Sequence, residues 1–311
     1  MSRILLTRRI PSSVFSQLES QHTVDLNDRD SLPREELKRR VADKDALICV
    51  LTDKIDAEVM ASGPALKVIA TIAVGYDNID VAAARERGII VTNTPDVLTQ
   101  AVAEFTWALI LGIARRVGEG DRLIRAGAWK RWGLDFMLGT ELHGKQLGII
   151  GAGRIGRAVA AKAPAFGMKA VFARRSPDVK DPAYISLDQL LISSDVVSIH
   201  TPQTPQTYHL IDKKALARMK RSALLVNTAR GPIVDEEALA WALGERLIAG
   251  AALDVYEREP QVHPDLLRRE NVLLAPHLGS ATRETRTAMA ELAVRNVLAV
   301  LAGDEPLAPV T

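Results

Sequence analysis

Short apolar runs alternate with stretches of helical spacing along most of the chain. In the first third, runs at residues 3–7, 46–51, 68–72 and 89–91 predict strands. A second series of strands is predicted at residues 147–150, 170–173, 196–199, 224–227, 251–253 and 272–274. Strands that alternate with helices pair in parallel, because each crossover helix returns the chain to the same end of the sheet. The pattern predicts an α/β protein with two doubly wound parallel sheets, the second of six strands.

Two predicted helices have unusual sequences. Residues 101–117, between the two series, carry apolar side chains around nearly the whole helix, among them Phe105, Trp107 and Ile113. Such a helix is buried on most sides, so we expect it at a domain junction or a subunit interface. The helix predicted at residues 157–166 contains Pro164, which removes a helical hydrogen bond. We expect that helix to kink or end near Ala163.

The composition is that of an ordinary globular protein and excludes several classes. The 311 residues are 47% hydrophobic and 25% charged, with a net charge of +2, so neither a nucleic-acid nor a membrane surface is indicated. The N-terminal apolar run is too short for a signal peptide, and no run approaches the roughly 20 residues of a membrane span. Cys49, the one cysteine, lies in a predicted strand and is expected to be buried, as suits a cytoplasmic protein. No Cys or His cluster indicates a metal site.

A glycine-rich turn follows the first strand of the second series. Residues 147–156 are Leu-Gly-Ile-Ile-Gly-Ala-Gly-Arg-Ile-Gly. Gly151 permits a tight turn, Gly153 lets the backbone approach a pyrophosphate, and Gly156 lets the following helix pack closely on the strand. Arg154 and Ile155 are assigned to the same site, since the helix N-terminus would face the phosphates. The motif predicts a dinucleotide site in a Rossmann-like domain; the alternative is an ordinary strand–turn–helix corner.

The residues after the next strand indicate which dinucleotide binds. An NAD-specific site places an acidic residue about 20 positions beyond the glycines, where it bonds the ribose 2′-hydroxyl. This chain has Arg174-Arg175-Ser176 at that place and no carboxylate. Two guanidinium groups and a hydroxyl match a 2′-phosphate. We therefore expect NADP(H) to be preferred over NAD(H); a solvated basic surface is the alternative.

Three further residues fit the reduction of a carbonyl group, which needs a proton donor and a polarising cation. Arg230 follows a predicted strand at its carboxyl end, and its guanidinium could hold an α-keto acid carboxylate and polarise the ketone. His277 also follows a strand and could exchange a proton near neutral pH. Glu259 could pair with His277 and keep the imidazole protonated. Each also has a structural explanation, as a member of a surface ion pair or as a hydrogen-bonded turn residue.

Three motifs around these residues resemble those of the D-isomer-specific 2-hydroxyacid dehydrogenases. They are Asn-Thr-Ala-Arg-Gly at 227–231, Leu-Asp-Val-Tyr-Glu-Arg-Glu-Pro at 253–260 and Pro-His-Leu-Gly-Ser-Ala-Thr at 276–282. The resemblance covers essentially the whole chain. It implies Arg230 as the substrate-binding arginine, Glu259 as the orienting carboxylate and His277 as the proton donor in reduction. It also implies that the substrate is bound at Leu51, Val74 and Gly75, with backbone N–H groups of the last two holding its carboxylate.

The resemblance further implies how the chain is organised. The substrate domain would comprise residues 1–97 and 283–311, with a long helix predicted at 283–301, and the dinucleotide-binding domain would comprise residues 98–282. The active site would lie in the cleft between the two domains. Further cofactor contacts are implied for Thr99, Thr201, Pro202, Thr228, Ala229, Asp254 and Gly279, with Asp254 near the carboxamide. A homodimer formed through residues near 100–145 is implied as well, and Trp132 would reach the neighbouring subunit's active site or lie at a plain interface.

Within the family, segments 74–80, 92–95 and 174–176 look most like those of the NADPH-using glyoxylate and hydroxypyruvate reductases. The expected function is therefore reduction of small 2-keto acids to D-2-hydroxy acids by hydride transfer. Two alternatives stay open. One is a dehydrogenase of another small anion, such as another 2-hydroxy acid, phosphite or formate. The other is a nucleotide-sensing protein that binds a partner, like the transcriptional corepressors that resemble this family.

Overall fold

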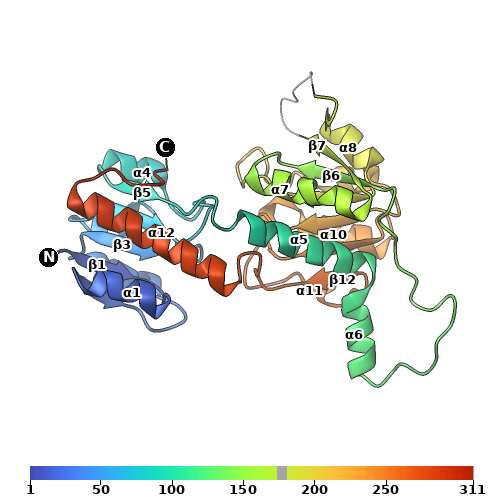
Figure 1. Ribbon diagram of the computed structural model, residues 1–311, viewed down its shortest axis with the longest axis horizontal. Coiled ribbons are helices and arrows are strands. Elements are labelled where there is room, and N and C mark those ends of the chain that lie inside the picture. The colour runs from blue at the N-terminus through green and yellow to red at the C-terminus, as the bar shows by residue number, and fades with distance from the viewer. Residues whose placement is uncertain (174–180, 311) are drawn as a thin grey trace. The chain divides into compact units, whose positions relative to one another are not determined.

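The computed structural model describes residues 1–173 and 181–310 (Figure 1). The chain divides into two compact units. The first comprises Met1–Leu98 and Thr282–Thr311, and the second comprises Thr99–Ala281. Each unit contains one parallel sheet with helices packed on both of its faces. The two parallel-sheet α/β domains predicted from the sequence are confirmed.

The described residues of the first unit form a five-stranded sheet in the order β2-β1-β3-β4-β5. The strands are β1 (Arg3–Leu6), β2 (Thr23–Leu26), β3 (Ala46–Cys49), β4 (Val68–Thr71) and β5 (Ile90–Thr92). The sequence pattern did not predict β2, because this edge strand is short and alternates polar with apolar residues. Cys49 is fully buried in β3, as expected.

Helices cover both faces of this sheet. They are α1 (Ser12–Glu19) and α12 (Arg283–Ala302) on one face, and α2 (Arg34–Val41), α3 (Ala57–Ser62) and α4 (Val81–Glu86) on the other. Successive strand residues point to opposite faces: Ile4 and Leu6 pack with α1 and α12, whereas Leu5 packs with the other three helices. The long C-terminal helix therefore completes the core of the first unit (Figure 1).

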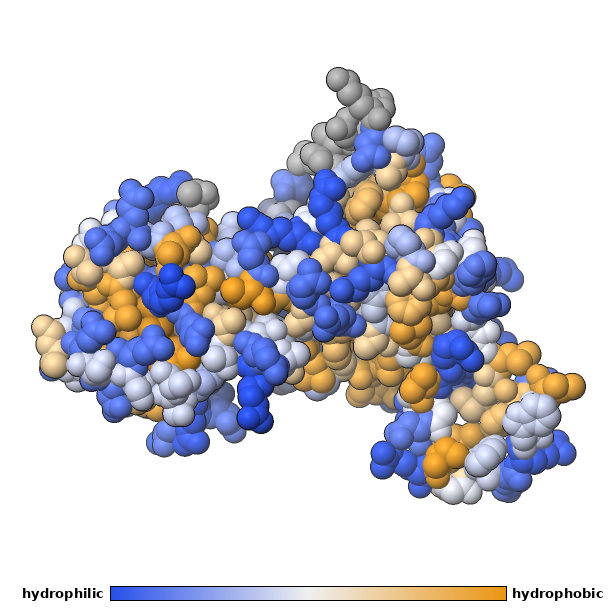
Figure 2. Space-filling model, viewed as in Figure 1, coloured by the Kyte–Doolittle hydropathy of each residue, from blue (hydrophilic) through white to orange (hydrophobic). Residues whose placement is uncertain are grey.

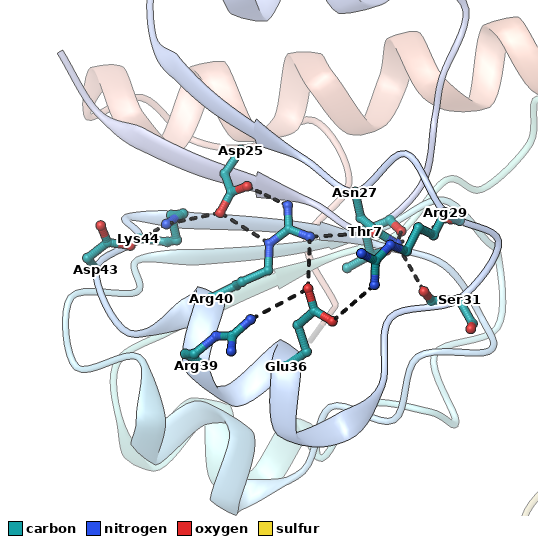
Figure 3. Close-up of polar contacts among 10 residues, drawn as sticks. All are labelled: Thr7, Asp25, Asn27, Arg29, Ser31, Glu36, Arg39, Arg40, Asp43 and Lys44. Carbon is teal, nitrogen blue, oxygen red and sulfur yellow. Dashed lines mark hydrogen bonds and ion pairs between the residues drawn. The ribbon is translucent and has the colours of Figure 1, made fainter.

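A network of charged side chains joins α2 to the edge strand β2 (Figure 3). Arg40 on α2 forms an ion pair with Asp25 on β2, and its Nη1 lies 3.8 Å from Glu36 Oε1. Lys44 Nζ lies 3.3 Å from Asp25 Oδ2 and also pairs with Asp43. Partial burial alone would raise the pKa of the Asp25 carboxyl, but the hydrogen bonds and charges of Arg40 and Lys44 outweigh it and lower that pKa. The network thus attaches the highly charged helix α2 to the edge strand of the sheet.

The described part of the second unit forms a seven-stranded sheet in the order β12-β11-β10-β9-β6-β7-β8. The strands are β6 (Gln146–Ile150), β7 (Lys169–Ala173), β8 (Tyr184–Ile185), β9 (Val196–Ile199), β10 (Leu224–Asn227), β11 (Gly250–Leu253) and β12 (Val272–Leu274). The prediction of six strands is wrong, because the sheet has a seventh, β8. This strand has only two residues, and no apolar run in the sequence indicates it.

Helices again cover both faces of the sheet. One face is covered by α5 (Thr99–Ala114) and α7 (Arg154–Lys162), and the other by α8 (Leu187–Ser193), α9 (Lys213–Arg218), α10 (Glu236–Gly244) and α11 (Pro264–Leu267). α6 (Val117–Arg125) follows α5, and 3-10 turns η1 (Ala163–Phe166) and η2 (Gly231–Ile233) complete the set.

Two expectations about these helices are confirmed. α7 ends at Lys162, and a 3-10 turn with Pro164 in it takes over at Ala163. α5 is buried over most of its surface, and its Trp107 Nε1 donates to the carbonyl oxygen of Val159 on α7 at 2.9 Å. α7 starts three residues earlier than predicted. No helix in the described part of the chain has the length and apolar character needed to cross a membrane.

Candidate active site

The glycine-rich turn joins β6 to α7. Gly151 has a φ of +103°, and a Cβ on it would lie 2.6 Å from the carbonyl carbon of His200, which follows β9. A Cβ on Gly156 would lie 2.1 Å from the carbonyl oxygen of Gly151. These two positions therefore require glycine. At Gly153 a Cβ would meet no described atom within 4 Å, and no described side chain caps the start of α7 there. The space beside Gly153 is thus open and the start of α7 lacks a side-chain cap, as a pyrophosphate bound to the first N–H groups of the helix would require.

The other residues predicted for the cofactor gather at one edge of the sheet. β9, β10, β11 and β12 are parallel, so their carboxyl ends point to the same edge. The residues that follow these strands are Thr201, Pro202, Thr228, Ala229, Asp254 and Gly279. β6 pairs with β7 on one side and β9 on the other, so the strand order reverses beside the glycine turn, where such sheets bind ligands.

Six predicted cofactor positions remain, of which the structure describes three. Thr99 is the first residue of α5, and Arg154 and Ile155 form the first turn of α7. Arg174, Arg175 and Ser176 lie outside the described residues.

The turn after β10 carries Arg230. Asn227, the last residue of the strand, fixes this turn: its Oδ1 accepts from the N–H of Ala229 at 3.0 Å, and its Nδ2 donates to the carbonyl oxygen of Arg230 at 2.8 Å. Arg230 Nη1 donates to the carbonyl oxygen of Ala229 at 2.8 Å. The sequence analysis missed the role of Asn227. Its signal is a short amide side chain at a strand end, where it can bond backbone groups two and three residues on.

The structure brings His277 and Glu259 together. His277 Nδ1 lies 2.8 Å from Glu259 Oε2, and Glu259 Oε1 accepts from the N–H of Tyr256 at 3.1 Å. The two side chains are 28% and 26% exposed. His277 has a φ of +55°, and its own N–H donates to the carbonyl oxygen of Asp254 at 2.9 Å. Both members of the pair are thus held by backbone bonds and still reach solvent.

The charge of Glu259 is set by its neighbours. Burial alone would raise the pKa of the Glu259 carboxyl, but the hydrogen bond and charge of His277, the N–H of Tyr256 and the charge of Arg230 together lower it. Glu259 is therefore ionised throughout the neutral range, with its Oε2 beside the imidazole of His277. Glu259 thus interacts with each of the other two residues predicted for catalysis.

Asp254 has a structural task that the sequence did not predict. It is 1% exposed, its Oδ1 accepts from the N–H of Leu278 at 2.6 Å, and its Oδ2 accepts from the N–H of Gly279 at 2.8 Å. Burial raises the pKa of this carboxyl, although the two N–H groups act in the opposite direction. By holding both amides, Asp254 shapes the turn that carries His277.

In the first unit, the residues predicted for the substrate follow neighbouring strands. Leu51 lies after β3, and Val74 and Gly75 lie after β4. Asn78 ties the two loops together, because its Nδ2 donates to the carbonyl oxygens of residues 50 and 53 at 3.2 and 2.8 Å. The sequence analysis missed Asn78. An amide side chain in the loop just beyond Gly75 could have indicated a residue that bonds the backbone of a neighbouring loop.

The sequence matches a known family over most of the second unit. The model described as "D-isomer specific 2-hydroxyacid dehydrogenase, NAD binding domain" matches residues 107–279. A glyoxylate reductase of Thermofilum pendens is 51% identical, over 98% of this chain and 93% of that protein. The chain belongs to the D-isomer specific 2-hydroxyacid dehydrogenase family. The resemblance drawn from the motifs is thereby confirmed. A glyoxylate reductase of Thermococcus litoralis is 45% identical to this dehydrogenase, over 98% and 95% of the two chains.

Solved structures share the fold of this dehydrogenase. A protein of Thermus thermophilus has a TM-score of 0.95 and 48% identity, covering 99% of this chain and all (100%) of that one. An NADPH-dependent glyoxylate/hydroxypyruvate reductase of Sinorhizobium meliloti, solved in complex with NADP and malonate, has a TM-score of 0.91 and 34% identity, covering 100% of this chain and 97% of that one.

Proposed function

We propose that this dehydrogenase reduces glyoxylate and hydroxypyruvate, two small 2-keto acids, to D-2-hydroxy acids. The observation that carries the proposal is the 2.8 Å contact between His277 and Glu259, with the charge of Arg230 acting on the same carboxylate. A proton donor, a carboxylate that favours its protonated form and a cation for the substrate are what this reduction requires. The relatives named glyoxylate reductase, at 51% and 45% identity, support the choice of substrate.

Arg230, His277 and Glu259 divide the tasks of the proposed reaction among them. NADPH, held at the glycine turn of residues 151–156, would supply the hydride that reduces the carbonyl carbon of the keto acid. Arg230 holds the carboxylate of the substrate and polarises the neighbouring carbonyl group. His277 gives a proton to the carbonyl oxygen, which becomes the hydroxyl group of the product. Glu259 orients the imidazole through Nδ1 and keeps the ring protonated before the transfer.

The choice of NADPH rests on the sequence. The glycine turn and the open start of α7 suit the pyrophosphate of either dinucleotide. We propose that Arg174, Arg175 and Ser176 bind the 2′-phosphate that distinguishes NADPH. The S. meliloti relative, described as NADPH-dependent and solved with NADP, supports this choice.

We propose that the N–H groups of Val74 and Gly75 bind the substrate carboxylate and that Leu51 borders the substrate. Asn78 holds their two loops in one arrangement, which would preorganise these groups before the substrate arrives. The cofactor contacts of the residues at the sheet edge of the second unit, and a cytoplasmic location, stay predictions of the same kind.

We propose that the dehydrogenase is a homodimer formed through α6 and the segment that follows it. Trp132, Leu134 and Leu138 in that segment are 73%, 85% and 66% exposed. Figure 2 shows hydrophobic residues interspersed with hydrophilic ones on this segment, which extends from the sheet and helices of the second unit. Apolar side chains gathered at the surface mark interaction sites. A second copy of the chain is the partner because the family resemblance implies self-association through residues near 100–145.

Initial rates with purified protein test the proposed reaction. Glyoxylate and hydroxypyruvate are each assayed with NADPH and with NADH, and we expect turnover of both keto acids, faster with NADPH. His277→Ala is expected to lower kcat by about 100- to 10,000-fold and to leave NADPH affinity within a few-fold. Unchanged turnover in that variant would remove His277 from the mechanism. No turnover of either keto acid would direct attention to phosphite, formate and other 2-hydroxy acids, or to a nucleotide-sensing protein.

A further inference from the structure

One buried carboxylate anchors the segment that carries Glu259 on both sides. Glu236, the first residue of α10, is 7% exposed. Its Oε1 accepts from the N–H of Glu257 at 2.7 Å, and its Oε2 accepts from the N–H of His263 at 3.2 Å. Glu257 precedes Glu259 by two residues, and His263 follows it by four. A single side chain from another element therefore holds the backbone before and after Glu259.

The anchoring is reciprocal. Glu257 Oε1 accepts from the N–H of Glu236 at 2.8 Å, which is one of the first-turn N–H groups that have no partner within a helix. His209, in the stretch after β9, adds a third segment to the contact: its Nε2 lies 3.2 Å from Glu257 Oε1, and its Nδ1 lies 3.8 Å from Asp235 Oδ2. Three parts of the chain meet at these two glutamates.

The start of α10 does not itself require the Glu236 carboxylate. Asp235 already caps the helix, because its Oδ1 accepts from the N–H of Ala238 at 2.9 Å. Burial raises the pKa of the Glu236 carboxyl, and the N–H groups of Glu257 and His263 act against that rise. A buried carboxylate is costly unless each oxygen is bonded, and within the described residues both oxygens of Glu236 bond only the segment that carries Glu259. The placement of this carboxylate is explained by the segment it holds.

We propose that Glu236 is a positioning residue, which fixes Glu259 opposite His277 by holding the backbone on both sides of it. The inference rests on the proposed role of His277 as the proton donor. Tyr256, whose N–H bonds Glu259 Oε1, is the immediate neighbour of Glu257. A displacement of Glu257 therefore reaches the carboxylate that faces His277. The short charge-assisted bond between Glu259 Oε2 and His277 Nδ1 weakens steeply as its length grows.

Glu236→Gln tests the proposal, with Glu237→Gln as its matched control. Glutamine at 236 keeps one acceptor oxygen but presents an NH₂ group to the second backbone N–H. Glu237 is the next residue along α10 and is exposed, so its variant makes the same change of charge at the same helix end. Two readouts are compared: kcat and KM for glyoxylate as a function of pH, and the pH titration of the His277 imidazole followed by NMR in the absence of substrate. The chain has six histidines, and His277→Asn identifies the signal of His277.

In Glu236→Gln we expect kcat to fall by about tenfold, KM to stay within a few-fold, and the falling limb of the rate profile to move to lower pH. The midpoint of the His277 titration should move in the same direction, because the displaced Glu259 carboxylate would lie farther from the ring. The charge of Asp254 also acts on His277, and the charge of Arg230 acts on Glu259. Asp254, Arg230 and Glu259 are the same residues in both variants as in the wild type. Glu237→Gln should match the wild type in both readouts.

Glu257→Ala gives a second, independent variant. It removes the bond to the N–H of Glu236 but leaves both backbone N–H groups on the Glu236 carboxylate, so we expect a smaller shift in the same direction. If the wild type is active and neither the pH–rate profile nor the His277 titration shifts in Glu236→Gln, the positioning role is overturned. If Glu236→Gln does not fold, the absence of a shift in Glu257→Ala overturns it. A wild type inactive toward 2-keto acids would instead overturn the proposed function, and the NMR titration would still decide whether Glu236 positions the pair.

Discussion

The backbone of Gly231 lies directly against the peptide group of Tyr256. A Cβ on Gly231 would stand 1.8 Å from the carbonyl carbon of Tyr256 and 2.4 Å from the nitrogen of Glu257. Gly231 follows Arg230, and the N–H of Tyr256 bonds Glu259. The contact between these two backbones therefore sets the separation between the cation and the carboxylate of the proposed active site.

Gly231→Ala should damage this arrangement. Because the nearest atoms belong to backbone, they cannot move aside as a side chain does, and the two segments must separate. We expect kcat/KM for glyoxylate to fall by about 100-fold, the effect of a displacement of about 1 Å in a catalytic group. Gly120→Ala on α6 is the control, since its Cβ would meet Met137 Cε at an ordinary 3.9 Å. Full activity of a folded Gly231→Ala protein would show that the contact is not needed.

Glu259→Gln should change how the reduction depends on pH. The ionised carboxylate beside His277 stabilises the protonated ring. Without this charge the ring loses its proton at a lower pH, so the rate should begin to fall at a lower pH than in the wild type. The measurement is kcat/KM for glyoxylate across the neutral range. If kcat/KM falls at the same pH in Glu259→Gln as in the wild type, the proposal that Glu259 keeps His277 protonated would be contradicted.

Arg174→Ala and Arg175→Ala should each reduce the preference for NADPH. Each charge-assisted bond to the 2′-phosphate contributes roughly 1.5–3 kcal/mol, which corresponds to about a tenfold to a hundredfold change in the ratio of kcat/KM with NADPH to that with NADH. The values with NADH should stay within a few-fold. Arg221→Ala, at an exposed arginine before β10, is the control. An unchanged ratio in the Arg174 and Arg175 variants would assign these arginines to the solvated surface.

Charged substitutions in the exposed apolar segment should separate the proposed homodimer. Trp132→Glu together with Leu134→Glu places two carboxylates where the second copy would bury apolar side chains, and burial of unpaired charge is strongly unfavourable. Sedimentation velocity should show the mass of a dimer for the wild type and of a monomer for the double variant. Ile192→Glu, at a residue of α8 that is 58% exposed, should leave the dimer intact. A monomeric wild type would refute this assembly.

Asp25→Asn should lower the stability of the first unit at neutral pH but not in acid. Its neighbours Arg40 and Lys44 lower the pKa of Asp25, so the charge stabilises the fold above about pH 4 and this contribution is lost as the pH falls through the lowered pKa. We expect a loss of about 1 kcal/mol at neutral pH, seen as a melting temperature lower by a few degrees. Asp28→Asn is the control, because Asp28 is 70% exposed and 3.8 Å from its partner Arg9. An equal difference at both pH values would argue against an electrostatic origin.

Local patterns in the sequence were sufficient for the central strands. The runs at 196–199 and 224–227 coincide with β9 and β10, because central strands of a parallel sheet are buried on both faces and must be continuously apolar. The edge strands β2 and β8 bury less and carry no such run. The same reason explains why α2, with only Leu37 and Val41 buried, was not predicted.

The family, the two parallel sheets and the kinds of chemical group at the strand ends follow from the sequence alone. Which of these groups meet depends on how the chain packs. Glu236 bonds amides 21 and 27 residues away, Asp254 bonds amides 24 and 25 residues away, and Glu259 meets His277 across 18 residues. Separation along the chain does not fix such distances, because the intervening turns and helices must first pack. A hydrogen bond, by contrast, is formed or lost within a few tenths of an ångström.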